Sequence, residues 1–398
     1  ERLGENAVGS SESKRREVRE RFKWLDAKHV VDDKGRRPSH EDYDGNTVRV
    51  PSHLKLSASQ KQYWDVKSKF RDVVLFFKVG KFYELYEDDA EIGCAALDWK
   101  MTVSGVGHCR QVGCPESGVD AAIAELVRRG HKVGRIEQME TAAEAKARTG
   151  SKTAVIRREL LETTSPATAV DGDLLPSRGG QSGVSSREGQ SGVRPAHLMA
   201  IAPSAIAERG DGNALNASAT VGFAFLDAAA GTLRCGSFAD DADSKPRGAQ
   251  SHIALSTLLT QTSPAEVLVR RGDGGRTEAR VRAALADGDP SAAPRVTSVA
   301  SDADEGGPEG FFFPARARDA DAALARFFLR DEKNTDARTT QSDKSDILAF
   351  VATQPAETRC AVAALAAHLT RLRCAAPLLA AEAATHAVYA PGETARLD

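Results

Sequence analysis

Residues 73–89 read VVLFFKVGKFYELYEDD, and this stretch decides the fold of the first part of the chain. Its first seven residues are almost all apolar, aromatic or β-branched, which predicts a buried β-strand at Val73–Val79. Gly80 and Lys81 end this strand. Helical character follows over Leu85–Ala96, so the sequence predicts a strand, a tight turn and then a helix.

Phe82, Tyr83 and Glu84 come directly after the turn. In an extended segment, residues two apart point to the same side. Phe82 and Glu84 can then meet one partner while Tyr83 faces the core, and Tyr86 is also expected in the core. An exposed phenylalanine after a strand is more often a packing residue than a ligand contact, so these residues alone do not assign a site.

The segments around this stretch alternate between helix-like and strand-like patterns. Ser57 followed by Gln60 predicts a capping box at the start of a helix. The other expected elements are an amphipathic helix at 119–129, stopped by Gly130, strands at 132–138 and 154–162, and a helix at 142–148. This alternation predicts an α/β or α+β domain.

A second region of strand-like runs follows a Gly/Ser-rich segment. SRGGQSGVS and SREGQSGVR are a nine-residue near-duplication that starts at Ser177, and their composition predicts flexible coil. HLMAIA, TVGFAFLDA and TLRCGSF then predict three strands, with Gly231 in a turn between the last two. The run CAVAALAAHLTRL that starts at Cys360 is strongly helical, and we interpret it as the opening of a third, helical domain.

Residues 1–50 are polar and charge-rich, and basic residues recur from Lys14 to Arg37. Little apolar surface is available there to offset the ordering of the chain, so most of the segment is expected to be a mobile basic arm. Such an arm can bind DNA phosphates, a partner or an import receptor, or it can be a solvated tail without a partner. Phe22 and Trp24 indicate that one short piece docks onto something.

The composition is globular: 398 residues, 41% hydrophobic and 28% charged, are enough for two to three domains. Lys plus Arg (54) and Asp plus Glu (56) leave a net charge of −2, whereas a protein that held DNA by charge alone would be more basic. If DNA is the ligand, its contacts must therefore be concentrated locally and must depend on shape. No apolar run reaches about 18 residues, which predicts no membrane span. The chain begins at Glu1 without Met, and we expect it to be part of a longer protein.

The six cysteines are sparse and form no Cys-x-x-Cys pair, which is typical of a reducing compartment. His108, Cys109 and Cys114 are the nearest approach to a metal-binding cluster. They lack a second pair of ligands, so no metal site is predicted.

The segment KVGKFYELYEDD, residues 78–89, resembles the Phe-x-Glu element of the mismatch-binding domain of the MutS family. RFKWLDAKHVVDDKGRRPSHEDYD before it, and GHKVGRIEQMET and TVGFAFLDAAAGTLRCGSFADDA after it, are similar to the eukaryotic MutS homologue six class. SASQKQYW, LFFKVGKFYELYE, LDWKMTVSGVGHCRQVG and KVGRIEQMETAAEAKAR look most like the plant-type branch called MutS homologue seven. The similarity covers about residues 20–398 with one insertion and is weak over 272–345.

Together with the patterns above, the resemblance implies a mixed α/β fold class in five parts. They are a mobile basic arm at 1–50, a mismatch-binding domain at 51–170, a flexible Gly/Ser-rich insertion at 171–195, an RNase H-like connector domain at 196–345 and the truncated start of a helical lever or core domain at 346–398. The resemblance further implies the mismatch-reading subunit of a heterodimer with MutS homologue two, located in the nucleus and bound to double-stranded DNA that contains mismatches.

The resemblance implies that Phe82 is a wedge that enters the minor groove beside a mismatch, and that Glu84 accepts a hydrogen bond from the displaced base. A mismatched step is cheaper to unstack and bend, so deformation can itself be the signal. Unstacking costs a few kcal/mol per step, and stacking on an aromatic ring returns about 1–3 kcal/mol per base. The cost of unstacking should exceed the stacking energy on paired DNA, and the two should nearly balance at a mismatch.

Further candidates for contact with the DNA backbone or groove surround the motif. Lys78 and Lys81 flank it and could hold phosphates, or could be solvated charges. Lys100, Met101 and Arg110, with the loop at 104–113, are weaker candidates for lining the groove.

No G-x-x-x-x-G-K-[ST] motif occurs in the 398 residues, so this chain should not hydrolyse ATP or need a cofactor. The resemblance implies an ATPase, with ATP and Mg, in a C-terminal domain beyond Asp398. Two alternatives remain: an RNase H-like nuclease, which needs clustered acidic metal ligands, and a scaffold that has lost DNA reading. Asp227, Asp240 and Asp241 have no obvious partner cluster, which argues against the nuclease. Intact Phe82 and Glu84 argue against the scaffold.

Overall fold

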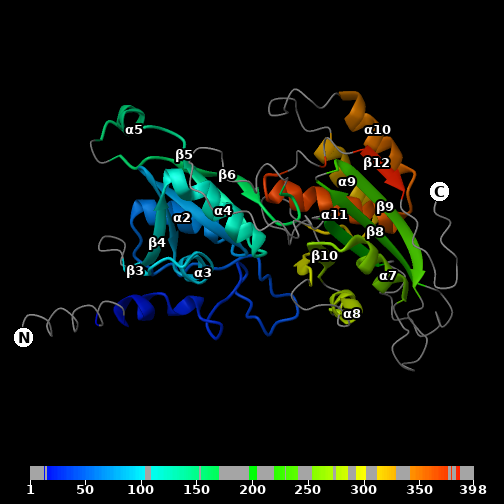
Figure 1. Ribbon diagram of the computed structural model, residues 1–398, viewed down its shortest axis with the longest axis horizontal. Coiled ribbons are helices and arrows are strands. Elements are labelled where there is room, and N and C mark those ends of the chain that lie inside the picture. Colours follow the sequence, from blue (N-terminus) through cyan, green and yellow to red (C-terminus); the bar gives the residue numbers. More distant parts are fainter. Residues whose placement is uncertain are drawn as a thin grey trace, which may run out of the picture. The chain divides into compact units, whose positions relative to one another are not determined.

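The computed structural model describes residues 13, 16–103, 109–151, 154–169, 197–203, 219–228, 230–240, 253–271, 275–285, 293–301, 312–328, 341–374, 378 and 382–385. The chain divides into two compact units, Glu1–Ser165 with Asp171–Gly179 and Pro166–Val170 with Gly180–Asp398. Within the described residues each unit holds one six-stranded mixed sheet accompanied by helices, so the mixed α/β fold class is confirmed (Figure 1). The insertion expected at 171–195 lies outside the described residues.

The sheet of the first unit has the strand order β3-β4-β2-β1-β5-β6. Its strands are β1 (Val73–Val79), β2 (Phe82–Tyr86), β3 (Thr102–Val103), β4 (Arg110–Pro115), β5 (Lys132–Gln138) and β6 (Arg158–Thr164). β1 is the expected buried strand, since it lies between β2 and β5 and six of its seven residues are buried. A strand covered on both faces has no polar side, which explains its nearly unbroken apolar run. Gly80 turns the chain from β1 into β2 with a φ of +60°, which glycine adopts without strain.

The helices of this unit are α2 (Ala58–Lys67), α3 (Asp88–Leu97), α4 (Val119–Arg128) and α5 (Ala142–Thr149). The capping box at the start of α2 is confirmed, because Ser57 accepts from the backbone N–H of Gln60 and the Gln60 side chain accepts from the backbone N–H of Ser57. The helix expected from Leu85 begins later, because Leu85 and Tyr86 continue β2. Leu85 is fully buried opposite Val112 of β4. The prediction was wrong at this end since the alternation of exposed and buried residues through β2 outweighs helical propensity.

Residues 16–50 pack into the first unit, so the prediction of a mobile arm is wrong for this part of it. Phe22 stacks on Trp64 of α2 with ring centroids 5.9 Å apart, and Trp24 meets the same ring edge-on at 5.1 Å. The docking expected of Phe22 and Trp24 is thus confirmed. Buried apolar side chains are spaced along the segment at Val18, Phe22, Leu25, Val30 and Val48. They are few, but Trp64 of α2 supplies a large aromatic surface for Phe22 and Trp24, an apolar contact that the segment lacks within itself.

The sheet of the second unit has the strand order β11-β10-β7-β8-β9-β12. Its strands are β7 (His197–Pro203), β8 (Ala219–Asp227), β9 (Thr232–Asp240), β10 (Glu266–Arg270), β11 (Arg295–Val299) and β12 (Glu382–Thr385). β7, β8 and β9 form an antiparallel meander, while β10 runs parallel to both β7 and β11. The three expected strands are confirmed, and Gly231 turns between the last two with a φ of +64°.

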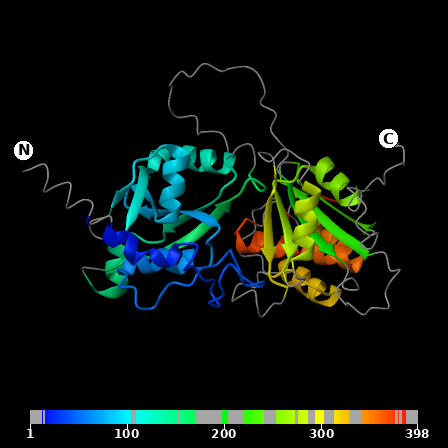
Figure 2. The ribbon, with the colours of Figure 1, turned by 90° about the horizontal axis from the view of Figure 1, so that it is seen from below.

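Helices cover both faces of this second sheet (Figure 2). They are α7 (Ile253–Thr262), α8 (Arg276–Leu285), α9 (Ala317–Phe328), α10 (Gln341–Ala352) and α11 (Ala356–Arg371). Alternate residues of β7 enter different cores: Leu198 and Ala200 pack with α9 and α11, and Met199 and Ile201 pack with α7 and α8. In the part of the chain that the structure describes, no helix has both the length and the apolar character to cross a membrane.

α11 is part of the second unit, and the prediction that it opens a separate third domain is wrong. Its residues share one core with β7 and β8, and most of the helix is buried. The contact is close at Gly222 of β8, where an added Cβ would lie 2.3 Å from the Glu357 carbonyl carbon. Thr358 Oγ1 also donates to the Gly236 carbonyl at 2.9 Å. A helix that is apolar on nearly all sides needs such a buried position.

Candidate nucleic-acid interface

β2 presents Phe82 on one face of the first sheet and Tyr83 on the other. Phe82 is 53% exposed, whereas Tyr83 is 1% exposed. Glu84 is half-buried and lies on the same face as Phe82, because strand residues two apart share a face. The expected alternation is therefore confirmed: an aromatic ring stands out at the start of β2 beside the turn, and a carboxylate follows on the same side.

Glu84 has a hydrogen-bond partner on its own strand. The Tyr86 hydroxyl donates to Glu84 Oε2 at 2.6 Å. Burial raises the pKa of Tyr86 far above its usual value, and the adjacent Glu84 charge adds to that effect, so the hydroxyl stays a donor. The Tyr86 ring is held edge-on against Tyr63 at 4.9 Å and lies 5.9 Å from Phe77.

The strand beside Glu84 approaches it closely at a glycine. Gly113 of β4 pairs with Glu84, and an added Cβ at Gly113 would lie 2.5 Å from the Tyr83 carbonyl oxygen. A residue with a side chain therefore cannot fit there without a shift. On the other flank, the Arg158 guanidinium lies 4.9 Å from the Phe77 ring centroid and donates to the Lys78 carbonyl at 2.7 Å. Burial lowers the pKa of Arg158, and the charge of Glu84 is among the groups that oppose this shift.

The contact between Tyr86 and Glu84 was not predicted from the sequence. The Tyr86 ring packs against Tyr63 and Phe77 as a core residue would, but its hydroxyl also donates to Glu84. The signal was present in the spacing, because a tyrosine two residues after a glutamate on a strand lies on the same face. It was missed because this part of the sequence was expected to be helical.

Lys78 does not lie at this interface, and its assignment as a phosphate contact is wrong. It pairs with Tyr83 across the hairpin and so points to the opposite face. Its side chain is buried, with Nζ 2.6 Å from Glu116 Oε1 and 4.3 Å from the Tyr83 ring centroid. Burial acts to lower the pKa of Lys78, but the hydrogen bonds to Glu116 and Tyr83 outweigh it and the pKa is raised. Lys81, in the turn itself, is exposed and stays a candidate.

Arg110 is held by acidic side chains of the protein. Its Nε lies 2.8 Å from Glu87 Oε2, its backbone N–H donates to Glu87 Oε1 at 2.8 Å, and a second nitrogen of the guanidinium pairs with Glu91. Glu87 is fully buried at the start of α3. Arg110 therefore ties β4 to α3, and its charge is neutralised within the protein, so the prediction that it lines the groove is not supported.

Lys100 and Met101 come just before β3 at the edge of the sheet. Lys100 is exposed and Met101 is half-buried. β3 pairs with the end of β4 that lies opposite Tyr86, whereas Phe82 is at the other end of β2. Four strand residues separate these levels by roughly 13 Å. Because β3 runs antiparallel to β4, the residues that precede Thr102 lead back toward the level of Glu84, so Lys100 and Met101 stay candidates, while residues 104–108 of the expected loop lie outside the described residues.

The cysteines and acidic residues considered for other chemistry have local roles. Burial raises the pKa of Cys109 to about 12 and that of Cys114 to about 11, so both thiols stay protonated, while His108 lies outside the described residues. Asp227, the last residue of β8, accepts from the Ala230 N–H at 2.9 Å and lies 3.3 Å from His197 Nε2. Among the described residues, no group of three or more His, Cys, Asp or Glu side chains could hold a metal ion. Asp241 lies outside them.

Comparison with known proteins places these observations in a family. Residues 57–173 match the model of MutS domain I. The chain is 46% identical to the DNA mismatch repair protein MSH7 of Arabidopsis thaliana over 258 residues, which are 64% of this chain and 20% of that protein. It is 32% identical to the DNA mismatch repair protein MSH6 of Saccharomyces cerevisiae over 273 residues, which are 67% of this chain and 20% of that protein.

A bacterial relative is similar over a shorter part of the chain. The DNA mismatch repair protein MutS of Caulobacter vibrioides is 38% identical over 142 residues, which are 34% of this chain and 16% of that protein. The chain thus spans about a fifth of the length of the relatives it matches. Residues 57–173, which carry Phe82 and Glu84, are a MutS domain I, and through this domain the chain belongs to the MutS family.

Proposed function

We propose that this chain reads mismatches in double-stranded DNA as part of a MutS-type mismatch-repair protein. The observation that carries the proposal is the pairing, within a MutS domain I, of an exposed Phe82 with Glu84 on the same strand face. Because the Phe82 ring is exposed, the protein core loses no stability when the ring moves from water into DNA. The ring is therefore free to insert between bases.

Deformation of the duplex is the signal that this geometry can read. A ring that enters the minor groove must unstack a base step, at a cost of a few kcal/mol. Stacking of the base on Phe82 returns about 1–3 kcal/mol, which is not enough on well-paired DNA. At a mismatch the step is already weakened, so the balance shifts toward insertion and bending. The near-neutral charge of the chain agrees with recognition by shape rather than by phosphate attraction alone.

Glu84 would accept a hydrogen bond from the base that Phe82 displaces. A carboxylate near DNA is repelled by the phosphates, so its presence needs a compensating contact. Tyr86 occupies Oε2, which leaves Oε1 as the acceptor for the base. We infer that Tyr86 is a positioning residue, because its packed ring fixes the hydroxyl and the hydroxyl fixes the orientation of the carboxylate.

Replacing Glu84 with alanine is expected to reduce the ratio of matched to mismatched dissociation constants by about 10-fold or more, since hydrogen bonds to charged groups contribute about 1.5–3 kcal/mol. Affinity for matched DNA should stay the same or rise, because a charge that repels phosphates is lost. Fluorescence anisotropy with labelled G·T and matched duplexes, for the protein alone and with MutS homologue two, measures both. Glu159→Ala removes a carboxylate on β6 and is the matched control. A drop in affinity for matched DNA would show that Glu84 is placed wrongly.

Replacing Tyr86 with phenylalanine should lower the same ratio by about 2- to 10-fold, because the ring and the Glu84 charge stay and only the hydrogen bond that orients the carboxylate is removed. Matched-DNA affinity should not change. Tyr43→Phe is the control, since the Tyr43 hydroxyl accepts from Arg71 at 2.6 Å and does not contact Glu84. If Tyr86→Phe discriminates as well as the unchanged protein, the positioning role is refuted while the role of Glu84 stands on its own test.

The proposal extends to the whole protein. Its partner would be MutS homologue two, its location the nucleus, and its energy source an ATPase domain that binds ATP and Mg beyond these 398 residues. The support for these parts is the similarity to proteins named MSH7 and MSH6. Mismatch preference that depends on added MutS homologue two would support the heterodimer.

A further inference from the structure

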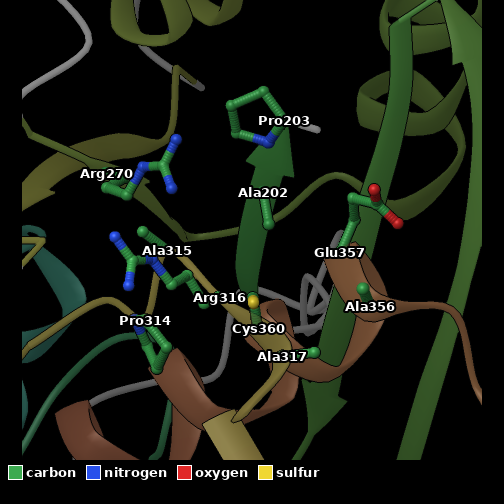
Figure 3. A pocket seen from close by; sticks show the side chains of 10 residues that line it. All are labelled: Ala202, Pro203, Arg270, Pro314, Ala315, Arg316, Ala317, Ala356, Glu357 and Cys360. Atoms are coloured by element: carbon green, nitrogen blue, oxygen red, sulfur yellow. The ribbon is translucent and has the colours of Figure 1, made fainter. Parts of the chain in front are cut away.

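The second unit contains a small pocket of about 210 Å³ at the carboxyl ends of β7 and β10 (Figure 3). Most of the surface that lines it is apolar, and Glu357 alone among its lining residues carries a carboxylate. An RNase H-like nuclease needs clustered acidic ligands for its divalent cations. This pocket therefore does not favour a nuclease, whereas the turn that carries Phe82 in the first unit has contacts with a direct bearing on DNA reading.

The turn before Phe82 has little packing of its own. Gly80 has a φ of +60°, and an added Cβ there would meet no atom within 4 Å. Lys81 and the Phe82 side chain are exposed. Because side-chain packing does not fix this turn, its orientation depends on hydrogen bonds and charges.

Glu116 supplies two of these contacts. It is the first residue of the short 3₁₀ helix η2 (Glu116–Gly118), which follows β4 directly. Its backbone N–H donates to the Lys81 carbonyl at 2.9 Å and so holds the residue just before Phe82. Its side chain reaches β1, where Oε1 lies 2.6 Å from Lys78 Nζ. Glu116 therefore ties both sides of the turn to the end of β4.

Lys78 is itself held on several sides. Its Nζ lies 4.3 Å from the ring centroid of Tyr83, the residue directly after Phe82. Its backbone carbonyl accepts from Arg158 Nε at 2.7 Å. The Lys78 side chain is 9% exposed, whereas that of Glu116 is 60% exposed. A buried ammonium group needs its partners, so Lys78 offers Glu116 a fixed point of attachment.

We propose, on the basis of the function proposed for Phe82, that Lys78 and Glu116 are positioning residues that hold the turn and keep the Phe82 ring oriented for entry into DNA. Insertion at a mismatch is favoured by a small margin, since the energies of stacking and unstacking nearly balance. A turn that is already ordered avoids the entropy cost of ordering the chain during insertion. The ring does not enter matched DNA, so the ion pair should act on mismatch preference alone.

Hydrogen–deuterium exchange of the full chain without DNA tests whether the ion pair holds the turn. The variant is Glu116→Asp, which keeps the charge and the backbone N–H but is one methylene shorter and loses the contact with Lys78 Nζ. Exchange in residues 79–86, followed by mass spectrometry, is expected to become at least about 3-fold faster. Glu125→Asp is the matched control, because it shortens a carboxylate that pairs with Arg128 and Arg129, and it should leave this rate unchanged. If Glu116→Asp exchanges at the rate of the unchanged protein, the proposal is wrong whatever Phe82 does.

DNA binding tests whether the ordered turn serves mismatch reading. With G·T and matched duplexes, the ratio of matched to mismatched dissociation constants should fall at least about 3-fold in Glu116→Asp and in Lys78→Met. In a Phe82→Ala background, Glu116→Asp should have no further effect, because it acts through the ring. Should Phe82→Ala keep its mismatch preference, the wedge fails and the positioning role fails with it, even where exchange shows that the ion pair orders the turn.

Lys78→Met also separates a positioning role from direct contact with a phosphate. With a positioning role, affinity for matched DNA and its dependence on salt stay as in the unchanged protein. With a phosphate contact, affinity for matched and mismatched DNA falls together, and the slope of log K against log[salt] decreases by about 1. That second result, or a ratio that neither variant changes, would overturn the proposal.

Discussion

Replacing Phe82 with alanine is expected to abolish the preference for mismatched over paired DNA. The ring is 53% exposed, so its loss removes little from the core and the domain should keep its fold. What disappears is stacking on the displaced base, about 1–3 kcal/mol, which corresponds to a factor of about 5 to 150 in affinity for the mismatch. Matched DNA does not pay for insertion, so its affinity should change little.

The measurement is the dissociation constant for a G·T duplex and for the matched duplex of the same length, at one fixed salt concentration. Leu161→Ala is the matched control, because Leu161 on β6 is 47% exposed and lies in the same unit. It should leave the ratio of the two constants unchanged. Phe82→Tyr keeps an aromatic ring and should retain most of the discrimination. Equal discrimination by Phe82→Ala and the unchanged protein would remove the wedge assignment.

Local patterns predicted the elements that depend on neighbouring residues. The apolar run of β1, the capping box at Ser57 and the helix stop at Gly130, whose φ is +90°, all follow from interactions within a few positions. The exposed face of Phe82 and Glu84 also follows from the two-residue period of a strand. The period alone assigns them no role, and it was the resemblance of residues 78–89 to the Phe-x-Glu element of the MutS family that identified them as site residues.

Lys78 shows where pattern reading failed although the information was present. The two-residue turn at Gly80 and Lys81 sets Val79 opposite Phe82, and this register sends Lys78 to the face of Tyr83. The position of Lys78 next to the motif in the sequence predicts a phosphate contact only if this register is ignored. The lesson is that proximity in sequence to a site does not give proximity in space when the chain is a strand.

Contacts between distant segments could not be predicted in the same way. The packing of residues 16–50 depends on contact with Trp64 of α2. The position of α11 depends on Gly222 of β8, where a side chain would clash with the helix. Arg110 is neutralised by Glu87 and Glu91, which lie about twenty positions earlier. Nothing within these segments indicates which distant residues they contact. The sequence alone therefore allowed residues 16–50 to be mobile, α11 to open a third domain and Arg110 to be free for DNA.

The core of the first unit contains a charged network of this long-range kind. Lys67 Nζ on α2 lies 2.7 Å from Asp89 Oδ1 on α3, and also donates to the Val73 carbonyl at 2.7 Å. Asp89 Oδ2 accepts from the Tyr63 hydroxyl at 2.8 Å and from the Leu75 N–H at 3.0 Å. Burial and the adjacent Asp89 raise the pKa of Tyr63 well above its usual value, so its hydroxyl remains a donor. The network joins two helices to β1, next to the strand that carries Phe82.

Replacing Lys67 with methionine is expected to destabilise the first unit by about 3–5 kcal/mol, because the Asp89 carboxylate is left buried without its counter-charge. Adding Asp89→Asn should recover part of the loss, since a neutral amide oxygen can still accept from Tyr63 and Leu75. Lys61→Met, an exposed change on the same helix, is the control and should shift stability by less than about 0.5 kcal/mol. Urea unfolding followed by tryptophan fluorescence isolates the effect, because all three tryptophans of the chain lie in the first unit. If Lys67→Met and Lys61→Met unfold at the same urea concentration, the charged network does not hold the helices to the sheet that presents Phe82.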